Sequence, residues 1–244
     1  MFDVFRALAN RHRTQEWMDA PDADPEQLRK SLSFIRQVNT LFRYTRTTLR
    51  HLERFSRGWQ PGQTIRILDL ATGSADVPHA ILKWAHKRGF DVRIVGADLH
   101  ARTLAEAGAE HDPNLMLLRA DALHLPFEDA SFDYVITSMF LHHLDDSQIV
   151  AVLENMNRVA SRGIIAADLL RRRRAYFWIS IFTLFANPMV RHDARVSVAQ
   201  ALSRAEVLGI RDRAGIGFAS YHVHFGHRFV LAGEKPGVNA RVVV

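Results

Sequence analysis

Beyond its first quarter, the chain alternates short apolar runs with longer amphipathic ones, and this alternation most limits the folds it can adopt. The runs 65–70, 92–97 and 163–168 are nearly all apolar, as expected of strands buried on both faces. Helical spacing of apolar residues is found at 77–88 and 146–159. Strands that alternate with helices indicate a doubly wound α/β fold with a mostly parallel sheet.

The end of the chain departs from this rhythm. A helix is predicted at 199–208, and two strands follow that are separated only by Gly226, His227 and Arg228. So short a connection permits a hairpin and forbids a parallel crossover, so one terminal strand is antiparallel to the rest. Residues 237–244 are expected to form a flexible tail. The seven predicted strands are 65–70, 92–97, 115–118, 132–137, 163–168, 220–225 and 229–232.

Residues 1–60 have a different character. Apolar residues recur at helical spacing from 24 to 57, and Asp24 before Pro25 is typical of a helix N-cap with proline at the first helical position. The segment 58–62 breaks this pattern. The sequence therefore predicts a helical appendage at 1–60 and an α/β domain at 61–236.

The chain has 244 residues, no cysteine and a formal net charge of +6. Without cysteine, disulfides, cysteine nucleophiles, thiolate zinc sites and iron–sulfur clusters are excluded. A basic balance fits nucleic acid, an anionic membrane surface, an anionic ligand or solubility alone. The longest apolar stretch, 175–186, is shorter than the roughly 20 residues that span a bilayer, and no secretory signal is recognisable. A cytoplasmic protein is expected.

The loop after the first strand is the first candidate binding site. It begins with Asp69, ends with Asp76 and contains small residues between them. In doubly wound folds, ligands bind at the carboxyl ends of the strands, where such a turn lets the backbone approach. Two carboxylates suit a cationic ligand better than the pyrophosphate of a dinucleotide.

Two further acids follow the next strands. Asp98 is placed to accept both ribose hydroxyls of an adenosine, although it also fits as the N-cap of the next helix. Asp121 can accept from an adenine amino group, and Leu99, Ala122 and Leu123 can sandwich the ring. Together these residues predict a site for a cationic adenosine derivative.

Four motifs in this order resemble class I S-adenosylmethionine-dependent methyltransferases. They are DLATGSAD at 69–76, GAD at 96–98, RADALHLPFEDASFDYV at 119–135 and MFLHHLDD at 139–146. The first and third look most like the small-molecule branch that includes the ubiquinone and menaquinone methyltransferases. The resemblance covers about residues 60–235 and implies a Rossmann-like methyltransferase domain, with 1–60 as its N-terminal helical lid.

The resemblance also implies S-adenosyl-L-methionine as the cofactor and S-adenosyl-L-homocysteine as its product. Asp69 would order the loop and the methionyl amine, Asp98 the ribose, and Asp121 the adenine. Ala71 and Ala75 stand where the family usually has loop glycines. The implied cofactor-binding residues are Asp69, Ala71, Gly73, Ser74, Ala75, Asp98, Leu99, Asp121, Ala122, Ser138 and Met139.

A sulfonium is an activated methyl donor, so such an enzyme mainly aligns the acceptor and excludes water. An oxygen acceptor also benefits from a base that removes its proton. His142 and His143 follow the fourth predicted strand and are the candidate catalytic residues, unless they only pack or cap the next helix. His222 and His224 share one face of a strand and fit structural roles better. No metal site is predicted.

The segment 170–198 is expected to form a hydrophobic substrate cap. It holds Arg171 to Arg174 and an aromatic run, and in this fold the connection after the fifth strand commonly builds the acceptor pocket. A buried core helix is the alternative, and 171–185 also fits peripheral membrane contact. The candidate substrate-binding residues are Phe42, Tyr44, Tyr176, Trp178 and Phe182.

The favoured function is O-methylation of a hydrophobic phenolic or polyketide-like small molecule by a monomer or homodimer. Its nearest alternative is C-methylation of a lipid-tailed quinol. Two alternatives of other classes are a non-catalytic methyltransferase-fold scaffold and an RNA methyltransferase. The second rests on the sequence pI near 10.1 and the arginine run, but no base-reading module accompanies them, so no nucleic-acid partner is expected.

Overall fold

The computed structural model describes residues 44–108 and 111–238, together with residues 8, 11, 14, 16–19, 24, 26, 27, 30 and 31. The predicted helical lid therefore lies largely outside the described residues, as do Phe42 and most of the predicted tail. Among the described residues of the predicted lid, the backbone N–H of Gln27 donates to Asp24 Oδ1 (2.8 Å), so Asp24 caps a helix as predicted.

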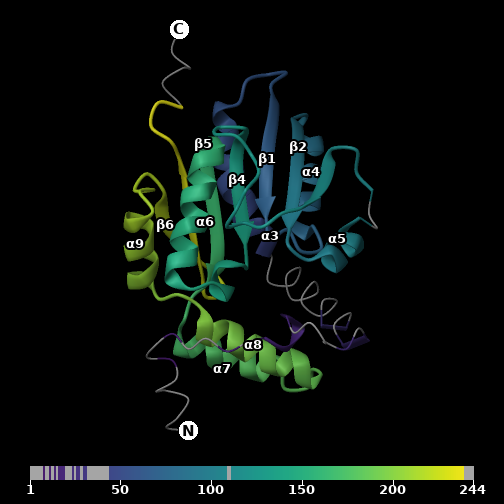
Figure 1. Ribbon diagram of the computed structural model, residues 1–244, viewed down its shortest axis with the longest axis vertical. Helices are drawn as coiled ribbons and strands as arrows, with labels where there is room; N and C mark the ends of the chain where they lie inside the picture. Colours follow the sequence, from purple (N-terminus) through teal and green to yellow (C-terminus); the bar gives the residue numbers. More distant parts are fainter. Residues whose placement is uncertain are drawn as a thin grey trace.

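A seven-stranded sheet forms the centre of the molecule, with the order β3-β2-β1-β4-β5-β7-β6 (Figure 1). Strand β7 runs antiparallel to both of its neighbours, and the other neighbouring pairs are parallel. The predicted fold class is confirmed. The strands are β1 (Thr64–Leu70), β2 (Asp91–Asp98), β3 (Leu115–Arg119), β4 (Phe132–Ser138), β5 (Ala160–Leu169), β6 (Ser220–His224) and β7 (Arg228–Glu234).

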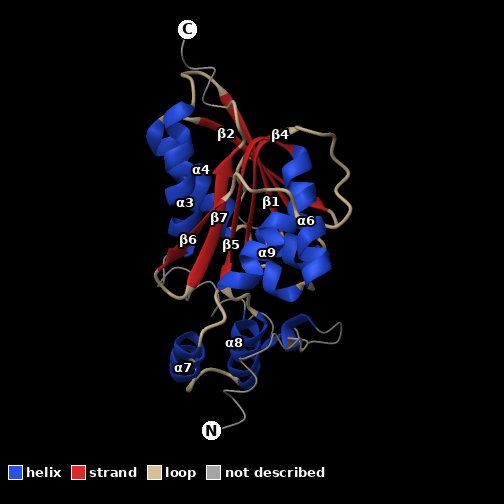
Figure 2. Cartoon of the chain, turned by 90° about the vertical axis from the view of Figure 1, so that its left-hand side faces the viewer, coloured by secondary structure: helices blue, strands red, loops and turns tan. Residues whose placement is uncertain are grey.

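Helices cover both faces of the sheet, as Figure 2 shows. On one face α3 (Tyr44–Phe55) and α4 (Asp76–Arg88) bury apolar side chains against the strands. On the other face α6 (Asp146–Val159) and α9 (Arg204–Arg213) do the same. Leu52 and Phe55 of α3 belong to the core, so this part of the predicted lid is a layer of the α/β domain. The other described helices are η1 (Trp17–Asp19), η2 (Ser56–Gly58), α5 (Ala101–Ala107), η3 (Leu141–His143), α7 (Arg173–Phe182) and α8 (Pro188–Gln200).

The predicted helix at 199–208 is wrong, because two helices meet there. Helix α8 ends at Gln200, and α9 begins after Ser203, whose side chain accepts from the Glu206 backbone N–H. The Glu206 carboxylate in turn accepts from the Ser203 backbone N–H (2.6 Å), which completes a capping box. This reciprocal cap starts a new helix inside a continuous apolar pattern.

Helices α7 and α8 project beyond the sheet at the carboxyl ends of its parallel strands (Figures 1 and 2). The predicted apolar run 175–186 is interrupted here, since α7 ends at Phe182 and α8 begins at Pro188 behind an Asn187 cap. This helical pair occupies the position expected of the predicted cap. Among the described residues, no helix combines the length and the apolarity needed to cross a bilayer.

Gly233 lets β7 and the segment before β6 approach closely. A Cβ at this position would overlap the Phe218 carbonyl oxygen and come within 2.8 Å of the Ala219 Cα. Both obstacles are backbone, so Gly233→Ala should lower the free energy of unfolding by about 1–3 kcal/mol. Gly209→Ala is the matched control, because a Cβ there meets only open space and removes flexibility from helix α9. Urea unfolding of both variants measures this difference, and equal stabilities would contradict it.

Candidate functional site

The predicted cofactor residues lie at one edge of the sheet. Asp69 is the last residue but one of β1, and Asp98 and Ser138 end β2 and β4. Asp121 follows β3. These four strands are neighbours in the order β3-β2-β1-β4 and run parallel, so their carboxyl ends meet. The sheet topology thus brings all eleven predicted positions to one edge, at the ends of strands or on the loops that follow them.

The loop between β1 and α4 holds an uncommon backbone conformation. Ala71, Gly73 and Ala75 all have positive φ, at 54°, 57° and 61°. A non-glycine residue pays about 1 kcal/mol or more for this left-handed region. The alanines therefore keep the backbone shape that glycine adopts more easily, and the strain is concentrated where the ligand is expected to bind.

Thr72 fixes this loop from within, and the sequence analysis missed it. Its backbone N–H donates to the Ala97 carbonyl (3.1 Å), and its hydroxyl donates to Asp69 Oδ2 (2.7 Å). Gly96 provides the space, since a Cβ there would lie 2.9 Å from the Thr72 hydroxyl. A threonine inside a small-residue loop is the signal that was available.

Asp69 is only 2% exposed. Burial, together with the negative charge of Asp98, raises the pKa of its carboxyl to about 7, and the hydrogen bond from Thr72 opposes this rise. A carboxylate kept out of water is stabilised by a cation placed beside it. This position therefore fits a ligand that carries an ammonium group.

Asp98 and Asp121 organise the backbone around them. The two carboxylate oxygens of Asp98 accept from the backbone N–H groups of Gly73 (3.0 Å) and His100 (2.9 Å). Asp121 accepts from the Leu123 backbone N–H (2.9 Å) and pairs with His124 Nδ1 (3.0 Å). The bond to His124, followed by the one from Leu123, lowers the pKa of Asp121. Asp121 is therefore ionised at neutral pH, and Asp98 is hydrogen-bonded directly to Gly73 of the strained loop.

A buried His–Asp pair lies beside this edge. His142 Nδ1 is 2.7 Å from Asp168 Oδ1, and the His142 backbone N–H donates to Asp168 Oδ2 (3.1 Å). Both side chains are about 2% exposed. Burial raises the pKa of Asp168, but the charge of His142 and three hydrogen bonds outweigh it, so the net shift is downward. The bond to Asp168 orients the imidazole ring, with Nδ1 toward the carboxylate and Nε2 on the opposite side.

Arg228 completes this network from the start of β7. It is 3% exposed, and burial lowers the pKa of its guanidinium to about 10 although Tyr44 and Asp168 oppose the shift. The guanidinium lies over the Tyr44 ring and donates to the Met139 sulfur (3.3 Å). Met139 itself has a positive φ of 59°. Tyr44 and Met139 are thus held together at the ends of β4 and β7.

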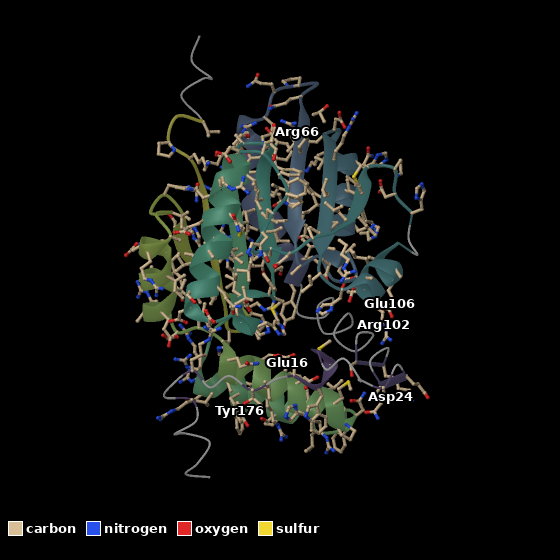
Figure 3. All side chains as sticks on the ribbon, viewed as in Figure 1. Glu16, Asp24, Arg66, Arg102, Glu106 and Tyr176 are labelled. Carbon is tan, nitrogen blue, oxygen red and sulfur yellow. The ribbon has the colours of Figure 1, made fainter. Side chains whose placement is uncertain are left out.

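The N-terminal segment reaches the same place, as Figure 3 shows for Glu16 between the sheet and α8. Glu16 Oε1 lies 3.8 Å from His142 Nε2 and accepts from the Ser197 hydroxyl (2.6 Å). Arg11 fastens the segment, since its guanidinium donates to Asp146 (2.8 Å) and to the Gln200 carbonyl (2.6 Å). The segment therefore closes over the His142–Asp168 pair.

Residues 67–163, which include most of these positions, match a family described as "Methyltransferase domain". Over this stretch the chain matches a methyltransferase domain. This agrees with the motif order and with the sheet order, and it confirms the predicted family at the level of the domain.

Relatives of this methyltransferase domain include the demethylmenaquinone methyltransferases of Staphylococcus haemolyticus and Bacillus subtilis. The first is 36% identical over 101 residues, which are 40% of this chain and 40% of that protein. The second is 27% identical over 179 residues, which are 66% of this chain and 75% of that protein. The chain thus spans about two fifths of the length of the first relative.

Solved structures share the fold. The plantazolicin methyltransferase BamL, in complex with SAH, has a TM-score of 0.64 and 14% identity over 91% of this chain and 79% of its own. A SAM-dependent methyltransferase from Aquifex aeolicus has a TM-score of 0.55 and 17% identity over 75% of this chain and 88% of its own. The shared fold agrees with the sequence prediction.

The structure brings together only some of the predicted substrate residues. Tyr44 lies under Arg228, and Tyr176 packs against the same small core cluster as Met139. Trp178 and Phe182 do not reach the site of the methyltransferase domain, because the inner face of α7 is formed by Ala175, Tyr176 and Ile179 and leaves them outside. They are 51% and 53% exposed, which corrects their predicted role in this structure.

Metal-ligand spacing occurs in one group among the described residues. Glu16, His142 and His143 each offer one atom, and these atoms lie within 4.8 Å of one another. The sequence prediction of no metal site missed this group, because Glu16 is distant in sequence. The His142 and His143 rings contact each other in a tilted arrangement with 4.2 Å between their centroids, and Glu16 already accepts from Ser197. These contacts fit a hydrogen-bonded base at least as well as a metal.

A cavity of about 550 Å³ lies between α3 and the β6–β7 hairpin. Its lining includes His51, Arg54 and His222 but none of the predicted cofactor residues, all of which the structure describes. His51 Nε2 is 3.0 Å from His224 Nε2. Burial, followed by the charges of His222 and His224, lowers the pKa of His51 to about 4. The paired strand histidines thus pack against α3 and not at the cofactor edge.

Proposed function

We propose that the chain transfers a methyl group from S-adenosylmethionine to a hydroxyl group of a hydrophobic small molecule. The observation that carries this proposal is the buried His142–Asp168 pair next to the strained, acid-lined loop. The residues present fit the cofactor, because Asp69 is a buried carboxylate whose raised pKa a cationic ligand would lower.

The cofactor, when bound, supplies a methyl group already activated as a sulfonium. Asp69 would meet the methionyl ammonium, the strained loop would follow the methionyl chain, and Asp98 and Asp121 would meet the ribose and the adenine. Ser138 and Met139 would lie beside the transferred methyl. This assignment places every predicted cofactor residue on a strand end or the loop after it.

His142 is the proposed general base. Its Nε2 would accept the proton of the acceptor hydroxyl as the oxygen bonds to the methyl carbon, whose bond to the sulfonium sulfur breaks to leave S-adenosylhomocysteine. Asp168 stabilises the imidazolium that results, and the backbone N–H groups of Leu169 and His142 help to keep Asp168 ionised. Glu16 covers Nε2, so an acceptor that reaches the base also meets this carboxylate. Tyr44 lies under Arg228, and Tyr176 packs on the same core cluster as Met139. These two tyrosines are the proposed aromatic contacts of the acceptor.

C-methylation of a lipid-tailed quinol is the second candidate, favoured by the relatives named demethylmenaquinone methyltransferase. The same base serves it, because removing a phenolic proton makes the ring carbon nucleophilic. Mass spectrometry and NMR of the product distinguish a new methoxy group from a new ring methyl. Blank labelled-methyl assays with both phenols and quinols, in protein that binds the cofactor, would contradict both acceptor classes.

Calorimetric titration with S-adenosylmethionine and S-adenosylhomocysteine tests the cofactor site. Asp98→Ala removes the acceptor of two backbone hydrogen bonds and should raise both dissociation constants about 10- to 100-fold. Asp91→Ala is the matched control, since Asp91 lies at the opposite end of the same strand. No binding by the wild-type chain would support a scaffold with a methyltransferase fold instead.

A further inference from the structure

The outer face of the cap carries large apolar side chains that nothing in the described structure covers. Trp178 and Phe182 belong to this face, and Phe185 in the following turn is 96% exposed. Because the opposite face of α7 packs on the domain, these side chains cannot turn inward together. We call this face the cap surface; it comprises Phe177, Trp178, Ile181, Phe182, Leu184 and Phe185.

Its charge is one-sided. Arg172, Arg173 and Arg174 are exposed at the start of α7, directly beside the cap surface. The sequence has no aspartate or glutamate from Leu169 to His192. A protein surface usually binds a protein partner with side chains of both charges. The stretch 169–192 instead combines arginines with aromatic and aliphatic side chains and contributes no acidic group.

A second exposed apolar element adjoins it. Phe225, in the turn between β6 and β7, is 87% exposed, and Val223 on β6 is 51% exposed. The backbone N–H of Leu170, two residues before Arg172, donates to the His227 carbonyl in the same turn (2.8 Å). Burial and then the positive charges of Arg172 and Arg174 lower the pKa of His227. The arginines are therefore set between two apolar elements that are distant in sequence.

We propose that the cap surface and the β6–β7 turn dock together on a phospholipid bilayer that contains anionic lipids. Aromatic side chains favour the boundary between headgroups and acyl chains, and arginines beside them pair with lipid phosphates. Two signals, apolar insertion and basic attraction, are what stable peripheral binding needs. A large exposed apolar patch on a monomer marks such an interaction site.

Docking in this way faces the site toward the bilayer. The cap projects from the edge of the sheet where the strand ends and the His142–Asp168 pair lie (Figures 1 and 2). An acceptor dissolved in the membrane would then reach the site without crossing water. This last step rests on the proposed function, whereas the docking itself does not.

Vesicle flotation with the full chain tests the proposal. Wild-type protein should bind vesicles of phosphatidylcholine with phosphatidylglycerol more tightly than vesicles of phosphatidylcholine alone, and Trp178 fluorescence should shift to the blue. The double variant Phe185→Ser/Phe225→Ser should lose at least tenfold in vesicle affinity. Arg172→Gln and Arg174→Gln should each lose about fivefold on anionic vesicles only. Met116→Ser, a change at a 65% exposed residue on β3, is the matched control.

Either of two results would overturn the proposal: wild-type protein that ignores anionic vesicles, or a double variant that binds them like Met116→Ser. Analytical ultracentrifugation identifies the competing occupant, since a wild-type dimer that the double variant dissociates would make the surface a self-association interface. Titration with S-adenosylhomocysteine distinguishes a failure of membrane docking from a failure of the proposed function. The double variant should bind that ligand as the wild type does.

Discussion

His142→Gln lowers kcat for methyl transfer to a hydroxyl acceptor by about 10²- to 10⁴-fold, the usual contribution of a general base. The variant keeps the shape and the hydrogen-bonding capacity of the side chain but loses the ring that accepts the proton. Asp168 still accepts from the backbone N–H groups of His142 and Leu169, so its carboxylate keeps hydrogen-bond donors in the variant. S-adenosylhomocysteine affinity should therefore stay at the wild-type value.

His143→Gln is the matched control for this prediction. His143 is the neighbour in η3 and shares its ring contact, but the bonds to Asp168 come from His142. Its kcat should remain within a few-fold of the wild type. Equal losses in both variants, or a loss of ligand affinity in His142→Gln, would contradict the assignment of His142 as the base.

A chelator distinguishes the base from a metal at the same group. Wild-type activity should survive treatment with EDTA and should not rise when divalent cations are added, because proton removal by His142 needs none. Activity that disappears with EDTA and returns with one cation would assign Glu16, His142 and His143 as ligands instead. Labelled-methyl assays on treated and untreated protein measure this directly.

The sheet could be predicted from the sequence because its signals are local. Each buried parallel strand is a short apolar run, and the hairpin is marked by a connection too short for a crossover. The boundary between α8 and α9 was missed because apolar spacing continues across Ser203, where only the capping box shows that a helix begins. Local patterns thus predict elements better than their ends.

The cofactor edge could also be predicted, since its residues follow successive strands whose ends must meet. The base could be predicted only in part. His142 was a candidate by position, but Asp168, Arg228 and Glu16 join it from β5, β7 and the N-terminal segment. Contacts between residues so distant in sequence depend on tertiary packing, and no local sequence pattern predicts them. For the same reason the outward orientation of Trp178 was not foreseen.

Asp69→Asn should weaken S-adenosylhomocysteine binding at pH 8 and remove its pH dependence. In the wild type, burial raises the pKa of Asp69 to about 7, so the carboxyl is neutral below this pH and ionised above it. Only the ionised form attracts the methionyl ammonium. The dissociation constant of the wild type should therefore rise about tenfold for each unit below pH 7 and level off above it. Calorimetry between pH 5.5 and about pH 8.5 measures both curves.

The stability of the ligand-free protein should fall as pH rises, whereas its affinity for the ligand should increase. The folded-state pKa of Asp69 lies above the ordinary value of 3.8, so the native state binds more protons than the unfolded state between pH 3.8 and about 7. This carboxyl therefore makes the free energy of unfolding fall as pH rises from about 4 to 7, and the loss persists above 7. Asparagine carries no charge at any pH, so Asp69→Asn should have a higher Tm than the wild type at pH 8 and an equal Tm near pH 4.

The two effects together separate a binding carboxylate from a structural one. A structural Asp69 would stabilise the ligand-free fold through its bond from Thr72, and its asparagine variant would have a lower Tm at every pH. A binding Asp69 destabilises the empty protein at neutral pH, and the ligand's positive charge offsets that cost on binding. Asp91→Asn, a change at an exposed residue of β2, should alter neither curve. A variant that is less stable at pH 8 yet binds normally would contradict the placement of the methionyl amine at Asp69.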